Sequence, residues 1–94
     1  MAFYDPNNSR IFVFALSTCV HCKRAKKLLN ELGVDYDHVE VDLLSDDEMD
    51  KALKEMSKYN PGQSFPTIIY GSKVIVGDRE DDIRQMAEKA QAAQ

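Results

Sequence analysis

The chain has 94 residues, of which 44% are hydrophobic and 30% are charged, and its formal net charge at pH 7 is −4. This length suits one domain of about 100 residues, so we expect a single domain over residues 1–94. The acidic balance argues against nucleic acid as a partner, because binding it requires positive charge that neutralises phosphates.

The sequence shows no sign of export or of membrane insertion. The longest apolar run, Ile11–Leu16, is far shorter than the roughly 20 residues that a membrane-spanning helix needs. The first ten residues lack the basic-then-apolar pattern of a signal peptide. Two cysteines are too few for a disulfide-rich secreted scaffold. We therefore expect a cytoplasmic protein that does not bind membranes.

The first half of the chain predicts a strand, a helix and a second strand. The apolar run over residues 11–16 is rich in β-forming residues and is typical of a strand buried on both faces. Residues 22–32 place apolar side chains at helical spacing, and Gly33 follows as a helix stop. Residues 36–43 alternate between apolar and polar, which favours a strand. The apolar side of that strand is expected to hold Val39, Val41 and Leu43.

The third quarter of the chain predicts a helix and a hairpin. Ser45 followed by Glu48 matches a capping box, and apolar residues then recur at helical spacing from residue 49 to residue 59. The β-rich runs Thr67–Tyr70 and Lys73–Val76 are joined by Gly71-Ser72. A two-residue connection of this kind is a hairpin signal.

A last helix completes the order strand, helix, strand, helix, strand, strand, helix. We expect Asp78 to cap it, because apolar residues follow at helical spacing. The first strand–helix–strand unit makes its two strands parallel, and the closing hairpin adds antiparallel strands. The predicted fold class is α/β, with a four-stranded mixed sheet covered by three helices. The inner side of the last helix is expected to hold Ile83, Met86, Ala87 and Ala90.

Cys19 and Cys22 lie where the first predicted strand meets the first predicted helix. A helix N-terminus carries partial positive charge and free N–H groups, which stabilise a thiolate. Because the thiolate is the species that attacks disulfides, Cys19 is predicted to be the nucleophile and the more buried Cys22 the resolving thiol. The product would be a redox-active Cys19–Cys22 disulfide. Positive potential near the pair is expected from Lys23, Arg24, Lys26 and Lys27.

Other uses of a Cys-x-x-Cys pair fit the composition less well. Structural zinc needs four ligands, and the chain adds only His21 and His38 to the two cysteines, so we expect no metal site within one chain. A purely structural disulfide is disfavoured because closing so short a loop removes little entropy from the unfolded state. The alternative that stays open is an iron–sulfur cluster or another metal bound between two chains.

Three segments of the sequence together resemble the glutaredoxin branch of the thioredoxin superfamily. They are Ser17–Cys22 after a buried strand, Ser64–Thr67 before the third strand, and Val76–Ile83 with its glycine turn and acidic helix start. The resemblance runs from Ile11 to about Ala90. It implies a thioredoxin-like glutaredoxin fold in the order βαβαββα, and an enzyme, a thiol–disulfide oxidoreductase with a redox-active centre that serves electron transport and cell redox homeostasis.

The resemblance also implies a substrate site around the cysteines and no tightly bound cofactor. Pro66 is expected to be cis, so that the backbone of Phe65 is open to an extended substrate that pairs with it as an added strand. His21 has two interpretations, a cation that helps to hold a thiolate or a solvated surface residue. The predicted substrate-binding residues are Thr18, Val20, His21, Phe65, Pro66, Thr67, Gly77 and Asp78.

The electron donor is left open between glutathione and a reductase. Glutathione-binding members of the family place a lysine shortly before the first cysteine, where this chain has Leu16, and paired glycines where it has Gly77-Asp78. An aspartate there would repel a carboxylate of glutathione unless Arg79 compensates. These departures favour a thioredoxin-reductase-like flavoenzyme, with glutathione as the other candidate co-substrate. The expected substrates are protein disulfides or glutathione mixed disulfides, and we expect a monomer.

Overall fold

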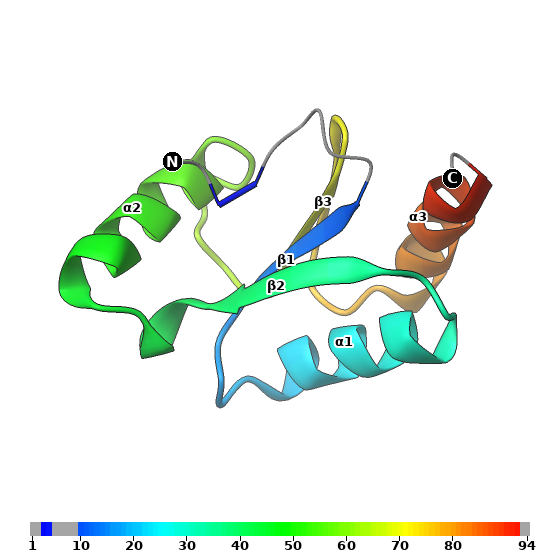
Figure 1. Ribbon diagram of the computed structural model, residues 1–94, viewed down its shortest axis with the longest axis horizontal. Helices are drawn as coiled ribbons and strands as arrows, with labels where there is room; N and C mark the ends of the chain where they lie inside the picture. The colour runs from blue at the N-terminus through cyan, green and yellow to red at the C-terminus, as the bar shows by residue number, and fades with distance from the viewer. Residues whose placement is uncertain (1–2, 5–9, 93–94) are drawn as a thin grey trace.

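The computed structural model of the chain describes residues 3–4 and 10–92 (Figure 1). Its helices and strands follow the predicted order, with one short 3₁₀ helix added after the second strand. In the described residues, no helix is both long enough and apolar enough to cross a membrane. The elements are β1 (Ile11–Ala15), α1 (Val20–Glu31), β2 (Tyr36–Glu40), η1 (Val41–Leu43), α2 (Asp46–Ser57), β3 (Thr67–Tyr70), β4 (Lys73–Val76) and α3 (Glu80–Ala92).

The four strands form one mixed sheet in the order β2-β1-β3-β4. β1 runs parallel to β2 and antiparallel to β3, and β3 pairs antiparallel with β4. Both the parallel first pair and the closing hairpin are therefore confirmed. Gly71 opens the hairpin turn with φ +61°, as the first central position of a type II′ turn requires. Glycine adopts this conformation readily because it has no Cβ.

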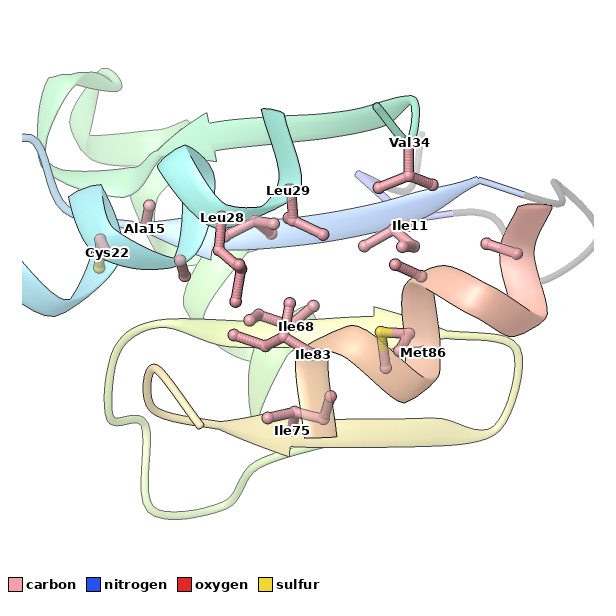
Figure 2. Packing of buried hydrophobic residues seen from close by; sticks show 14 residues of the cluster. Ile11, Ala15, Cys22, Leu28, Leu29, Val34, Ile68, Ile75, Ile83 and Met86 are labelled. Carbon is pink, nitrogen blue, oxygen red and sulfur yellow. The ribbon is translucent and has the colours of Figure 1, made fainter. Parts of the chain in front are cut away.

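β1 lies in the middle of the molecule and contributes to a hydrophobic core on each face of the sheet. Successive side chains of a strand point to opposite faces. Ile11, Val13 and Ala15 belong to the core beneath α1 and α3 (Figure 2). Phe12 and Phe14 belong to the core beneath α2. Every residue of β1 is buried, which confirms the prediction of a strand buried on both faces.

The second strand is shorter than the sequence predicts. It ends at Glu40, and residues 41–43 form η1 instead. Val41 is buried, but Leu43 is 70% exposed. The prediction that Leu43 lies on the apolar side of the strand was therefore wrong. A 3₁₀ helix has three residues per turn, and residues two apart therefore no longer lie on one face as they do in a strand. The turn also brings Asp42 to the site described below.

The helix starts agree with the sequence for α2 but not for α3. The hydroxyl of Ser45 accepts a hydrogen bond from the backbone N–H of Glu48 at 3.3 Å, as the predicted cap requires. The prediction that Asp78 caps the last helix was wrong. The carbonyl of Arg79 accepts the backbone N–H of Ile83 at 2.9 Å, so α3 begins from Arg79. The carboxylate of Asp78 contacts α1 instead.

Candidate active site

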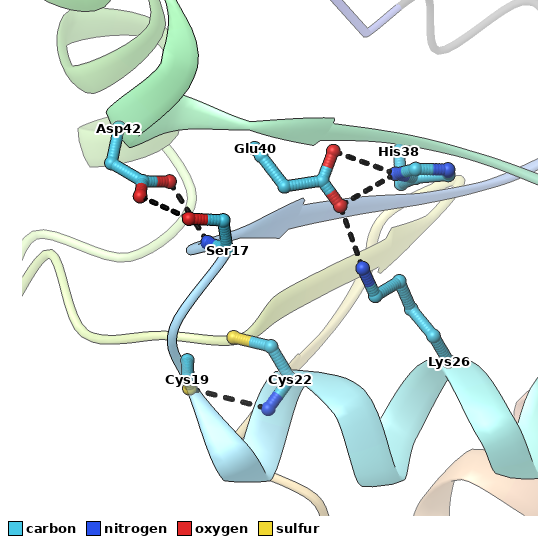
Figure 3. Close-up of polar contacts among 7 residues, drawn as sticks. All are labelled: Ser17, Cys19, Cys22, Lys26, His38, Glu40 and Asp42. Atoms are coloured by element: carbon cyan, nitrogen blue, oxygen red, sulfur yellow. Dashed lines mark hydrogen bonds and ion pairs between the residues drawn. The ribbon is translucent and has the colours of Figure 1, made fainter.

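Cys19 caps the N-terminus of α1 (Figure 3). Its Sγ accepts a hydrogen bond from the backbone N–H of Cys22 at 3.2 Å. Its carbonyl oxygen accepts a hydrogen bond from the backbone N–H of Lys23 at 3.1 Å. The N–H of Cys19 donates to the carbonyl of Leu16 at 3.2 Å, which closes the turn after β1. A sulfur in this position receives a helix N–H group and faces the positive end of the helix, and both stabilise a thiolate.

Cys22 lies one turn further along α1 and has no exposed surface. Burial raises the pKa of the Cys22 thiol to about 12, and the hydrogen bond with Cys19 contributes in the same direction. Cys19 keeps part of its surface exposed, and both residues are free thiols. The surface is therefore open to a disulfide substrate at Cys19 and closed at Cys22. This asymmetry supports the roles predicted from the sequence.

The segment around Pro66 lies beside the same core as the cysteines. The Phe65–Pro66 peptide bond is cis, which confirms the isomer that the resemblance implied. Pro66 and Thr67 are buried, and half-buried Phe65 packs against the same core cluster as Cys19. The carbonyl of Pro66 accepts the N–H of Gly77 at 2.9 Å, and Gly77 has φ +95°, a conformation that favours glycine. The turn after β4 is thereby tied to this segment.

Asn60, which directly follows the helical pattern of residues 49–59 in the sequence, organises the loop before Pro66. The residue is buried, and its Nδ2 lies 3.2 Å from the carbonyl of Ser64 and 3.0 Å from the hydroxyl of Thr67. Its Oδ1 accepts the N–H of Gly62 at 3.2 Å. One side-chain amide thus connects three parts of the loop. The local signal was the Asn-Pro-Gly sequence, because asparagine side chains commonly bond to the backbone two residues on.

His21 and Asp78 contact each other although they lie 57 residues apart in the sequence. The Nδ1 of His21 lies 3.2 Å from Oδ1 of Asp78, and Nη1 of Arg24 lies 3.8 Å from its Oδ2. The hydrogen bond with His21 holds the pKa of Asp78 below its usual value. The His21 side chain is 62% exposed, which agrees with the interpretation of a surface residue. The contact between His21 and Asp78 was not predicted from the sequence.

Thr18 and Val20 flank Cys19 at the surface. Thr18 is exposed, and Val20 is 58% exposed although it is apolar. Both residues are therefore exposed on either side of Cys19 along the chain. Their positions are compatible with the substrate contacts predicted for them.

The sequence model of the glutaredoxin family matches residues 11–75. The match covers more than half of the chain and includes both cysteines and Pro66. The chain belongs to the glutaredoxin family. Glutaredoxins are thiol–disulfide oxidoreductases that act on disulfide substrates, use glutathione and need no tightly bound cofactor, so this chain is a thiol–disulfide oxidoreductase.

Individual glutaredoxins and related structures agree with this assignment. A glutaredoxin from Ricinus communis is 35% identical over 72 residues, covering 76% of this chain and 68% of that protein. The crystal structure of Methanosarcina acetivorans methanoredoxin is 49% identical, with a TM-score of 0.79 over 83% of both chains. Buckwheat glutaredoxin in complex with glutathione is 26% identical, with a TM-score of 0.69 over 87% of this chain and 79% of that one. The predicted thioredoxin-like fold and oxidoreductase activity are thus confirmed.

The metal-binding alternative gains no support from these glutaredoxins. Nothing in the comparisons favours it over disulfide exchange. Across residues 3–4 and 10–92, no three His, Cys, Asp or Glu side chains gather into a group that could hold a metal ion. A cluster bound between two chains would need further ligands from elsewhere.

This glutaredoxin chain has an ion pair near its cysteines that the sequence pattern did not reveal (Figure 3). Lys26 is one of the basic residues expected to supply positive potential near the cysteines. Only 21% of its side chain is exposed, and its Nζ lies 2.6 Å from Oε1 of Glu40. The Nδ1 of His38 lies 3.0 Å from the same oxygen. Burial opposes the charge of Glu40, but the contacts with Lys26 and His38 outweigh it, and the pKa of Glu40 is lowered.

Ser17, in the turn that leads to Cys19, is held by Asp42 of η1. The N–H of Ser17 donates to Oδ1 of Asp42 at 2.8 Å, and the Ser17 hydroxyl donates to Oδ2. The hydrogen bond from the Ser17 hydroxyl lowers the pKa of Asp42 most, and the hydrogen bond from the Ser17 N–H lowers it further. The 3₁₀ turn that was predicted as strand therefore anchors the active-site turn.

Proposed function

We propose that Cys19 is the nucleophile and Cys22 the resolving thiol of disulfide exchange in this glutaredoxin. The Cys19 thiolate attacks one sulfur of the substrate disulfide, and the other sulfur leaves as a thiolate and takes up a proton. Cys22 then loses its proton and attacks Sγ of Cys19. The second substrate sulfur leaves, and the Cys19–Cys22 disulfide remains. The observation that carries this assignment is the pairing of a partly exposed helix-capping Cys19 with a fully buried Cys22.

The proposed substrates are protein disulfides and glutathione mixed disulfides, bound as an extended segment along Phe65. This residue precedes β3, which begins at Thr67, so it lies beyond the end of the strand ladder. Backbone groups in such a position can pair with an extended chain as an added strand. Thr18 and Val20 would contact the residues that flank the substrate sulfur.

We further propose that a thioredoxin-reductase-like flavoenzyme, rather than glutathione, restores the dithiol. Buckwheat glutaredoxin was solved with glutathione bound, so the family fold accommodates this ligand. This chain has uncharged Leu16 where the glutathione-binding members place a lysine. Asp78 adds a negative charge at the glycine turn, and its contacts with His21 and Arg24 reduce but do not remove its repulsion of a carboxylate.

Reduction of insulin by dithiothreitol tests the roles of the two cysteines. Cys19→Ser is expected to lose nearly all activity, because no nucleophile remains. Cys22→Ser is expected to form a mixed disulfide at Cys19, visible as an added mass on the intact protein, but to release it slowly. A Cys19→Ser variant with full activity would overturn the assignment.

The donor is tested separately by following NADPH oxidation with one disulfide substrate in two reactions. One contains glutathione and glutathione reductase, and the other contains thioredoxin reductase. We expect faster turnover with thioredoxin reductase. Efficient turnover with glutathione would overturn the proposed donor while leaving the roles of Cys19 and Cys22 intact.

A further inference from the structure

A half-buried ion pair lies one helical turn beyond the resolving thiol. Cys22 and Lys26 are four residues apart on α1, so their side chains share one face of the helix. Figure 3 shows both side chains rising from α1 toward the sheet. The Lys26 Nζ lies 2.6 Å from Oε1 of Glu40, and the two side chains are 21% and 19% exposed. The exchange mechanism described above uses neither charge.

A second ion pair on the same helix shows what is particular about the first. Lys27 Nζ lies 3.9 Å from Oε1 of Glu31, with the side chains 79% and 59% exposed. Water and salt screen an exposed cation of this kind, whereas a partly buried cation acts more strongly on its neighbours. Taking a lysine and a glutamate out of water is also costly. The partial burial of the Lys26–Glu40 pair therefore needs an explanation, whereas the exposed Lys27–Glu31 pair does not.

Cys22 is a group on this face that gains from a positive charge. Its thiol has no exposed surface, so water cannot stabilise its thiolate. The charge of Lys26 favours that thiolate and partly opposes the effect of burial, which raises the pKa of Cys22. Glu40 holds the ammonium group at the end of β2, which keeps it on the side of α1 that faces the sheet.

We propose that Lys26, held in place by Glu40, stabilises the Cys22 thiolate while this thiol resolves the mixed disulfide. The inference rests on the proposed roles of Cys19 and Cys22. In the resolving step, Cys22 Sγ releases its proton to solvent and its electron pair forms the bond to Cys19 Sγ. The bond between Cys19 and the substrate sulfur breaks, and that sulfur leaves with the electron pair and takes up a proton. Lys26 and Glu40 exchange neither protons nor electrons, and both are positioning residues.

The titratable groups that face this pair come from three elements. His38 shares Glu40 with Lys26, so the charge of His38 changes how far Glu40 neutralises Lys26. Variants are therefore compared with the unmodified protein at one pH. The groups are Cys19 and Cys22 at the start of α1, His38 on β2, and Asp42 on η1, which is bonded to Ser17.

Two substitutions with opposite expected effects test the proposal. Lys26→Gln removes the positive charge and is expected to slow the resolving step. Each unit by which the pKa rises lowers the thiolate population about tenfold, but the more basic thiolate is the better nucleophile, so the net slowing is about threefold per unit. Glu40→Gln keeps a hydrogen-bond acceptor for Lys26 but removes the counter-charge, and it is expected to speed the same step by a similar factor.

The step is isolated with a single equivalent of an aromatic disulfide whose thiol product is coloured. Stopped-flow absorbance at pH 7 then shows one thiol released as Cys19 attacks and a second as Cys22 resolves. Lys27→Gln is the matched control and should leave both phases unchanged, and Lys26→Arg should restore the second phase. If Lys26→Gln and Glu40→Gln leave the second phase unchanged, or both slow it, the inference is wrong. If Cys19→Ser still shows the first phase, the proposed function itself fails.

Discussion

The Nδ1 of His21 lies 3.2 Å from Oδ1 of Asp78, and this contact joins the N-terminal turn of α1 to the loop between β4 and α3. His21 stands inside the Cys-x-x-Cys motif, and Asp78 directly follows the glycine turn that is tied to Pro66. The contact therefore links two of the three segments that carry the resemblance to the family. It also places a carboxylate beside the redox site, with consequences for both stability and ligand choice.

Asp78→Asn is expected to lower the free energy of unfolding at neutral pH and to lose this effect in acid. The pKa of Asp78 in the folded chain lies below its usual value, with His21 as the main cause. Its carboxylate therefore stabilises the fold above the usual value of about 3.9, and the contribution is lost as pH falls through the lower folded value. Urea unfolding from pH 7 toward about pH 3 measures it. A difference between the two proteins that widens in acid would contradict the prediction.

Asp78→Gly is expected to raise kcat/KM for glutathione roughly three- to tenfold, which corresponds to about 0.7–1.4 kcal/mol. The physical reason is the removal of a negative charge from the turn where glutathione-binding members have a glycine. Steady-state assays with a glutathione mixed disulfide measure the change. Asp81→Asn, which removes a charge from an exposed residue at the start of α3, is the control and should have little effect. Unchanged or weaker use of glutathione in Asp78→Gly would show that this carboxylate does not limit it.

Iodoacetamide is expected to modify Cys19 and to spare Cys22 in the folded, reduced protein. Alkylation requires an accessible thiolate, whereas Cys22 has no exposed surface and a pKa raised to about 12. Mass spectrometry after brief reaction at pH 7 should find one adduct, located on Cys19, and a second only after unfolding in urea. Cys19→Ser should stay unmodified while folded. Equal labelling of both cysteines would be incompatible with this geometry.

Asn60→Ala is expected to lower the free energy of unfolding by about 1–3 kcal/mol, because the partners of its amide, buried Thr67 among them, lose their hydrogen bonds. Those partners include Ser64 and Thr67. Urea denaturation measures the loss. Asn30→Ala, at an exposed position of α1, serves as the control and should change stability by no more than about 0.5 kcal/mol. A similar small change for Asn60→Ala would mean that the loop is held by its other contacts.

Most of the fold could be predicted because its elements carry local patterns. The apolar run of β1, the Ser45 cap of α2 and the Gly71 turn each depend on residues close together in the sequence. The end of β2 could not be predicted in this way. Residues 41–43 continue the alternation of a strand, but the chain leaves the sheet after Glu40 and forms η1.

In the candidate site, too, the features that depend on neighbouring residues could be predicted and those that depend on distant residues could not. The sequence by itself determined the reacting pair, because two cysteines at a helix start interact through the geometry of one turn. Only the tertiary structure decided which charges surround them. Asp78 meets His21 from 57 residues away, Asp42 meets Ser17 from 25, and Glu40 meets Lys26 from 14. Electrostatic interactions depend on distance through space and on the exclusion of water, and spacing along the chain reports neither.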